Sequence, residues 1–164
     1  MKMNLAMDFL VDKESNSITI KREFAAPLQT VWEAFTKSEI LDQWWAPAPW
    51  KAQTKKMDFR EGGQWQYAML GPEGEVHWAL AQFTKIIPLV SYSGLDAFSD
   101  AEGNINKEMP QSQWDVSFSK SENKTLVFFR ISYNDLAQLE ATIQMGFKEG
   151  ITIAMEGLDA LLAK

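Results

Sequence analysis

The segment 24–47 constrains the fold of this chain more than any other part of the sequence. It reads F-A-A-P-L-Q-T-V-W-E-A-F-T-K-S-E-I-L-D-Q-W-W-A-P. Pro27 follows a short strand, and its fixed φ suits the first turn of a helix whose apolar residues recur at helical spacing. Ser38 is a good N-cap for a second short helix, which we expect to end at Trp44–Trp45 before Pro47 stops it. The segment therefore predicts a strand, two short helices and an aromatic latch.

The length and composition of the chain are those of one globular domain. Of its 164 residues 46% are hydrophobic, which is enough for a core of ordinary size. We predict a single domain over residues 1–164, with residues 1–16 as a loosely held arm. The net charge of −6 argues against binding to nucleic acid or anionic membranes, because phosphate groups are bound by clustered Lys and Arg.

Several kinds of site and location are disfavoured by what the sequence lacks. The chain has no Cys, so disulfides, thiolate nucleophiles and thiolate zinc sites are excluded. Its first residues interrupt an apolar run with Asp8 and make a poor signal peptide. No apolar run approaches the ~18 to 20 residues that span a bilayer. Cytoplasmic residence is therefore expected, and Asn123–Lys124, which begins a glycosylation pattern, is interpreted as a hairpin turn.

Seven stretches predict β-strands, most of them by alternation of apolar and other residues. They are residues 18–24, 52–59, 65–69, 76–87, 89–98, 114–118 and 126–132. Short turns join the last six, and one long helix is expected from about Asp135 to the end. This order predicts an α+β fold with an antiparallel sheet, because parallel strands would need crossover helices between them.

The terminal helix is amphipathic, with one broad apolar arc, so it should lie on the sheet. Gly146, Gly150 and Gly157 fall close together at one edge of that arc. Each glycine costs up to ~1 kcal/mol against Ala inside a helix, so the stripe needs a reason. We expect close approach of helix to sheet, and room for a ligand is the functional alternative.

These features together resemble the START-like, or SRPBCC, superfamily, and within it the bacterial homologues of the activator of the ninety-kilodalton heat-shock-protein ATPase. The matching parts are F-A-A-P with V-W-E-A-F, Trp44–Trp45 with Pro47, Arg60 with Gly62–Gly63, the G-P-E-G turn, Phe83 with Ile86 and Pro88, and residues 98–103. The resemblance covers residues 17–164. It implies a helix-grip fold, in which a curved antiparallel sheet wraps around the C-terminal helix and leaves a cavity between them.

Two positions depart from the pattern of that superfamily. Phe147 stands where a Trp is usual, which would change the shape of the cavity. Residues 89–97 lack the usual apolar strand pattern after Pro88. The superfamily implies a function only weakly, because its members carry apolar ligands, cyclise polyketides or bind partner proteins.

Aromatic side chains dominate the candidate ligand site. The chain has seven Trp, and rings of this kind offer apolar contact with a polar tip that can orient a ligand. We predict a ligand-binding set formed by Trp50, Trp65, Tyr67, His77, Trp114, Phe147 and Met155. No metal or redox cofactor is expected.

His77 is the only histidine, on the same predicted strand face as Ala79 and Ala81. A lone histidine cannot build a multi-histidine zinc site, and the chain has no nucleophile-elbow, phosphate-loop, dinucleotide or H-E-x-x-H motif. We interpret His77 as a hydrogen-bonding wall residue. Asp58 and Arg60 are interpreted as an ion pair that holds the turn before Gly62–Gly63.

The sequence leaves three functions open. The first is binding of a small, largely apolar ligand without a defined reaction. The second is a protein-interaction module like the heat-shock ATPase activator, or a homodimer. The resemblance implies that Val127 and Phe129 point inward, so Leu126 and Phe128 on the outer sheet face would supply a surface. The third is a cyclase-like or hydrolase-like enzyme that uses His77.

Overall fold

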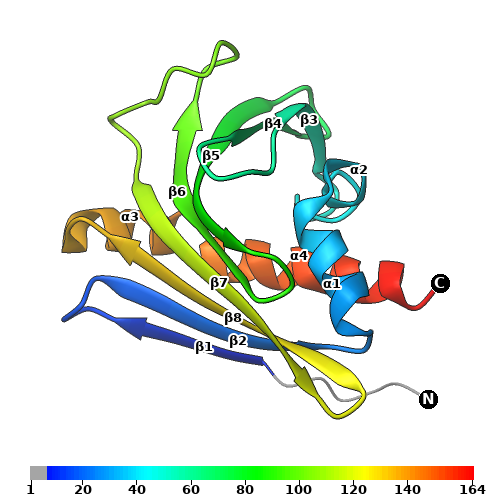
Figure 1. Ribbon diagram of the computed structural model, residues 1–164. Helices are drawn as coiled ribbons and strands as arrows, with labels where there is room; N and C mark the ends of the chain where they lie inside the picture. Colours follow the sequence, from blue (N-terminus) through cyan, green and yellow to red (C-terminus); the bar gives the residue numbers. More distant parts are fainter. Residues whose placement is uncertain (1–6) are drawn as a thin grey trace.

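A computed structural model describes residues 7–164 of the protein, and its elements follow the predicted order closely (Figure 1). They are β1 (Met7–Asp12), β2 (Ser17–Phe24), α1 (Leu28–Thr36), α2 (Ser38–Leu41), β3 (Lys51–Met57), β4 (Gln64–Leu70), β5 (Val76–Ile87), β6 (Ser91–Ser99), β7 (Gln111–Ser121), β8 (Lys124–Tyr133), α3 (Leu136–Gln144) and α4 (Phe147–Leu162).

The described strands form one antiparallel sheet in the order β1-β2-β8-β7-β6-β5-β4-β3. The connection through α1 and α2 carries the chain from β2 to β3 at the opposite edge. The sheet curves strongly, and α4 crosses the side that the curvature encloses (Figure 1). This confirms the predicted α+β helix-grip fold, an open curved sheet around a C-terminal helix.

The pairing of β5 with β6 is irregular and very close at one point. The register shifts between Phe83 and Lys85, and Gly94 lies opposite Phe83. A Cβ atom on Gly94 would lie 2.5 Å from the carbonyl oxygen of Gln82, so only glycine allows this approach. Although β6 lacks a regular apolar pattern, it pairs with β5 along its length and with β7 over residues 91–97.

The core lies between the enclosed face of the sheet and the helices. Period-two alternation places Ile20 of β2 and Phe129 of β8 inside, where they join Met155 and Leu158 of α4 in one buried cluster. Val127 is also fully buried, so the predicted inward phasing of residues 126–132 is confirmed.

A buried ion pair fixes the C-terminal half of α4 to the sheet. Arg22 of β2 is only 5% exposed, and its guanidinium binds both carboxylate oxygens of Asp159, one at 3.1 Å. Arg22 also donates to the carbonyl oxygen of Glu23 at 2.6 Å and lies over the ring of Phe24. A guanidinium so enclosed depends on this carboxylate for its charge balance.

The aromatic latch after α2 is present, but the helix before it is shorter than expected. Trp44 is buried, and its indole Nε1 donates to the carbonyl oxygen of Ala34 at 2.9 Å, which satisfies a group near the end of α1. Ser38 is not the N-cap of α2: Lys37 takes that position, without a side-chain cap. The helix ends at Leu41, and residues 42–46, which include the tryptophan pair, form turns and bends.

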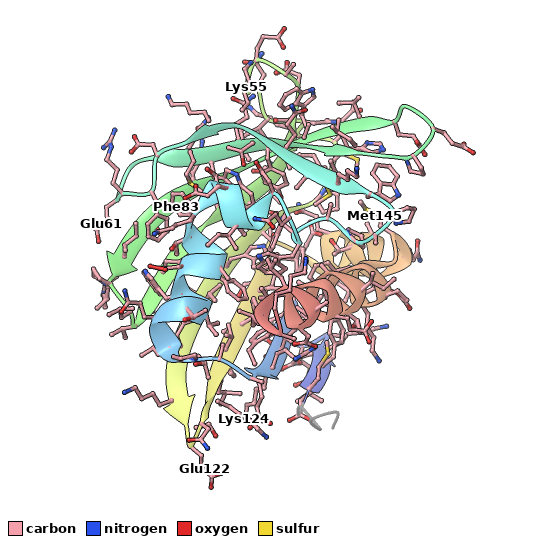
Figure 2. All side chains as sticks on the ribbon, turned by 90° about the vertical axis from the view of Figure 1, so that its right-hand side faces the viewer. Lys55, Glu61, Phe83, Glu122, Lys124 and Met145 are labelled. Atoms are coloured by element: carbon pink, nitrogen blue, oxygen red, sulfur yellow. The ribbon has the colours of Figure 1, made fainter. Side chains whose placement is uncertain are left out.

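Three predicted boundaries differ from the structure. Residues 7–12 are not a loose arm, because β1 pairs with β2 along its whole length; residues 1–6 of that arm lie outside the described residues. The terminal helix is two helices, since Gly146 has φ +86° and interrupts it. The β7–β8 turn is Glu122–Asn123, one residue earlier than predicted (Figure 2 shows Glu122 at its tip).

The structure tests two further interpretations, one of a turn and one of the outer face of the sheet. Arg60 Nε donates to a carboxylate oxygen of Asp58 at 2.7 Å, as predicted for this turn. Phe128 points outward but is half-buried, and the ammonium of Lys21 lies 5.9 Å from its ring centre. Within residues 7–164, no helix is long and apolar enough to cross a membrane.

Candidate functional site

A cavity of about 230 Å³ lies between the sheet and the C-terminal helices. The sheet side of its wall follows from register and pleat. Asp96 of β6 pairs with Ser112 of β7, which pairs with Tyr133 of β8, and all three line the cavity. Residues two positions along the same strands, among them Phe98 and Trp114, lie on the same face and line it too.

The opposite wall comes from α4 and from the segment after α2. Phe147, Gly150 and Ile151 contribute from the first turns of α4, and Trp45 and Pro47 close the cavity from the other side. The cavity therefore depends on three parts of the chain that are far apart in sequence.

The mouth of the cavity lies near the end of α3. Met145 and His77 line the cavity and are also exposed to solvent, Met145 to 51%. Figure 2 shows Met145 on the opposite side of the molecule from Glu61. A ligand entering here would pass a flexible thioether and an imidazole before it reached the aromatic interior.

Four of the seven predicted ligand-binding residues line this cavity: Tyr67, His77, Trp114 and Phe147. Trp65 lies behind Tyr67, stacked on it at 4.0 Å between ring centres, and lines a smaller neighbouring cavity of about 40 Å³.

The other two predicted residues do not border the cavity. Trp50 stacks on His77 at 5.4 Å between ring centres but lies outside the lining. Met155 is fully buried in the core cluster and does not line the cavity.

Hydrogen bonds and ring contacts fix the aromatic walls. Trp45 Nε1 donates to the Tyr67 hydroxyl at 3.0 Å, and its ring contacts that of Trp114 at 6.0 Å. Trp114 contacts Phe147 edge-on at 6.1 Å and donates from Nε1 to the hydroxyl of Ser112 at 2.9 Å. These contacts fix the positions of the rings in the cavity wall.

Asp96 is the functional candidate that the sequence analysis missed. It lines both the main cavity and the smaller one, so it stands on the wall between them. Burial raises the pKa of its carboxyl to about 7. The sequence did contain a sign of this role. Asp96 falls at every-second-residue spacing with Tyr92, Gly94 and Phe98, so it shares the face of the strand that carries the aromatic residues. An acidic residue on such an inward face is unusual.

Three tyrosines surround this acid. Burial raises the pKa of Tyr67 and of Tyr92, and the nearby charge of Asp96 adds to both effects. Burial also raises the pKa of Tyr133 to about 12, although hydrogen bonds with Thr142 and Ser112 act to lower it. All three phenols are therefore neutral near pH 7, and Asp96 is the acidic group of the cavity that ionises there.

The glycine stripe on α4 does not bring the helix close to the sheet, so that expectation is wrong. A Cβ atom on Gly157 would meet nothing within 4 Å, and one on Gly150 would meet only Pro47, at 3.8 Å. Gly146 serves the left-handed break between α3 and α4. Gly150, by contrast, lines the cavity, in line with the functional alternative.

His77 has a ring partner and no orienting hydrogen bond among residues 7–164. Trp50 covers one face of the imidazole. The hydrogen-bonding wall role proposed for His77 thus rests on contacts with a ligand or water. In the same range, no group of three or more His, Asp or Glu residues could hold a metal ion.

A family model supplies the decisive comparison. The model described as Activator of Hsp90 ATPase homolog 1-like protein matches residues 25–163. The chain belongs to this family. Membership confirms the resemblance drawn from the sequence, and a search of curated proteins finds no match.

Solved structures of similar proteins share the fold over nearly the whole chain. Protein Ms6760 from Mycobacterium smegmatis is 30% identical, with 97% of each chain covered and a TM-score of 0.88. A protein from Arthrobacter aurescens is 29% identical, and the match covers 95% of this chain and 91% of that protein, with a TM-score of 0.89. The AHSA1 protein from Silicibacter pomeroyi, 21% identical with a TM-score of 0.71 over 90% and 97% of the chains, supports the fold alone.

Proposed function

We propose that the protein binds a small, largely apolar ligand in the cavity between the sheet and α4. The observation that carries this proposal is a preformed aromatic cavity of about 230 Å³ on the enclosed face of the fold. Apolar clefts with a few placed polar groups are where proteins bind small molecules. The cytoplasmic location predicted from the sequence stays a prediction.

The volume of the cavity limits the size of the enclosed part of the ligand. An apolar protein cavity of about 150 Å³ holds benzene, so the 230 Å³ here corresponds to about nine non-hydrogen atoms. A substituted benzene ring or a small bicyclic ring system has this size. Longer ligands would extend through the mouth past Met145.

The two other functions left open by the sequence gain less from the structure. The outer face offers Phe128 only half-buried beneath Lys21, which is a small apolar surface for a partner protein. An enzyme using His77 would need a group that orients the imidazole, and Trp50 supplies a ring instead. A homodimer or protein partner remains a prediction.

The proposal is tested by filling the cavity from its helix wall. Gly150→Leu should place a side chain at the cavity beside Pro47, whereas Gly157→Leu on the same helix projects into open space. Both changes replace a helical glycine, so both should gain up to about 1 kcal/mol of helix propensity. We expect Gly150→Leu alone to lose binding of an aromatic probe such as indole, measured by isothermal titration calorimetry.

Native mass spectrometry of freshly purified protein supplies the complementary measurement. It should show a retained small molecule on wild type and on Gly157→Leu but not on Gly150→Leu, and it reports the oligomeric state at once. Equal probe affinity in all three proteins would show that binding does not use this cavity.

A further inference from the structure

Asp96 is held inside the cavity wall without a partner of opposite charge. Among residues 7–164 no Lys or Arg forms an ion pair with it, and no side chain donates a hydrogen bond to its carboxylate. The lining contains no Lys or Arg at all. Taking a carboxylate out of water is costly unless it is neutralised or paired, so a half-buried carboxylate without a partner is conspicuous.

The surroundings of Asp96 favour a cation as the missing partner. The rings of Trp45, Trp114 and Phe147 line the same cavity, and the electron-rich faces of aromatic rings attract ammonium groups. The net charge of −6 also favours the approach of a cation over an anion. The three tyrosines near Asp96 stay neutral near pH 7, so none of them becomes an anion that could bind the cation in place of Asp96. They are Tyr67, Tyr92 and Tyr133.

We propose that Asp96 is the recognition group of this cavity and that the ligand is a small aromatic or alicyclic amine, whose ammonium pairs with the Asp96 carboxylate while its ring lies against Trp45 and Trp114. This inference rests on the proposed function, because it names the chemical class of the ligand in the same cavity. The enclosed part of the amine has about nine non-hydrogen atoms, from the 230 Å³ of the cavity.

Charge pairing makes binding depend on pH in a defined direction. The carboxyl must lose its proton to pair with an ammonium, and burial raises its pKa to about 7. Amine affinity should therefore rise between pH 5.5 and pH 8, and binding near pH 6.5 should release a fraction of a proton. His77 also lines the cavity and is a second titratable group there, so the measurement is repeated in His77→Gln.

The probes are 2-phenylethylamine and 2-phenylethanol, which have the same shape and size but differ in charge. Isothermal titration calorimetry at pH 8 should give the amine at least about tenfold higher affinity, the usual gain of a hydrogen bond to a charged partner. Asp96→Asn should remove that preference and leave the affinity for the alcohol within about threefold. Asp115→Asn, an exposed acid on neighbouring β7, is the matched control and should change neither affinity.

A second measurement needs no substitution at Asp96. Titration of wild type with the amine at pH 6.5, in phosphate and in ACES, two buffers with different enthalpies of ionisation, reports proton release from the difference in observed enthalpy. Release in wild type and in His77→Gln supports the assignment even if Asp96→Asn does not fold.

The outcomes separate the two proposals. If the alcohol binds and the amine shows no preference and no proton release, the assignment of Asp96 is wrong while the cavity keeps its function. A preference that persists in Asp96→Asn overturns it as well. If neither probe binds wild type, the proposed function fails together with the inference, and Gly150→Leu then gives no contrast with Gly157→Leu.

Discussion

Replacing Asp96 by Asn should remove a pH-dependent destabilisation of the folded protein. Burial raises the pKa of this carboxyl from the ordinary 3.8 to about 7. Between these two values the folded protein holds a proton that the unfolded chain has released, so the free energy of unfolding falls as the pH rises. Above about pH 7 both states are ionised and the loss is complete.

The size of the effect follows from the pKa difference and the access of water. One pKa unit corresponds to about 1.4 kcal/mol, so a rise from 3.8 to about 7 corresponds to about 4 kcal/mol. The Asp96 side chain is half-buried and borders the cavity, so water screens part of its charge. The window from pH 5 to pH 8 contains about two of these units, or about 3 kcal/mol before screening, so we expect the wild type to lose about 2 kcal/mol there that Asp96→Asn does not lose.

Urea unfolding followed by tryptophan fluorescence at pH 5, 6, 7 and 8 measures this difference. The contributions of all other groups, His77 included, are common to both proteins and cancel in the comparison. Hydrogen bonds from Ser15 to Asp12 and from Asn104 to Asp100 lower the pKa of those acids, so their stabilisation is lost only at lower pH. Asp115→Asn should follow the wild-type profile.

Parallel pH profiles for wild type and Asp96→Asn, within about 0.5 kcal/mol, would refute the reasoning. They would mean that water or a neighbouring group already satisfies the ionised carboxylate. The expected result also has a functional meaning, because a group that destabilises the empty protein while it is ionised can be retained for the ligand that pairs with it.

Two further substitutions test the packing that shapes the cavity. Asp159→Asn should lower the free energy of unfolding in urea by about 2 kcal/mol, less than the loss of a fully buried pair because the Asp159 side chain is 29% exposed. The control Glu156→Gln, on the solvent side of the helix, should lower it hardly at all. Equal stabilities of the two variants would show that Arg22 does not need its partner. Gly94→Ala should cost about 1–3 kcal/mol because its Cβ meets the Gln82 carbonyl oxygen at 2.5 Å, and a thermal midpoint within about 1 °C of wild type would contradict the close approach.

Most of the fold could be predicted from the sequence because its signals are local. The apolar residues of 126–132 indicated a strand, and the family resemblance supplied its inward face, which agrees with the burial of Val127 and Phe129. The turn at Asp58 and Arg60 followed from neighbouring residues in the same way. Short-range periodicity and turn chemistry need no knowledge of distant partners.

The errors arose where a distant contact or the backbone conformation decides. The sequence of residues 7–12 contains no clear strand signal, and it becomes β1 because β2 presents an edge for pairing. Gly146 looked like part of a helical stripe, yet its positive φ ends α3. Propensity alone could not tell a glycine that packs from a glycine that breaks a helix.

The sequence by itself determined an α+β fold with an antiparallel sheet and an amphipathic terminal helix, because strand and helix periods are set by neighbouring residues. The helix-grip arrangement of these elements was implied by the resemblance to the START-like superfamily. Only the tertiary structure decided which side chains meet. It brought Tyr67, Trp114 and Phe147 to one cavity, left Met155 in the core, and placed Asp96 among them. The physical reason is that strand curvature and register set the direction of each side chain, and both depend on pairing between segments far apart in the chain.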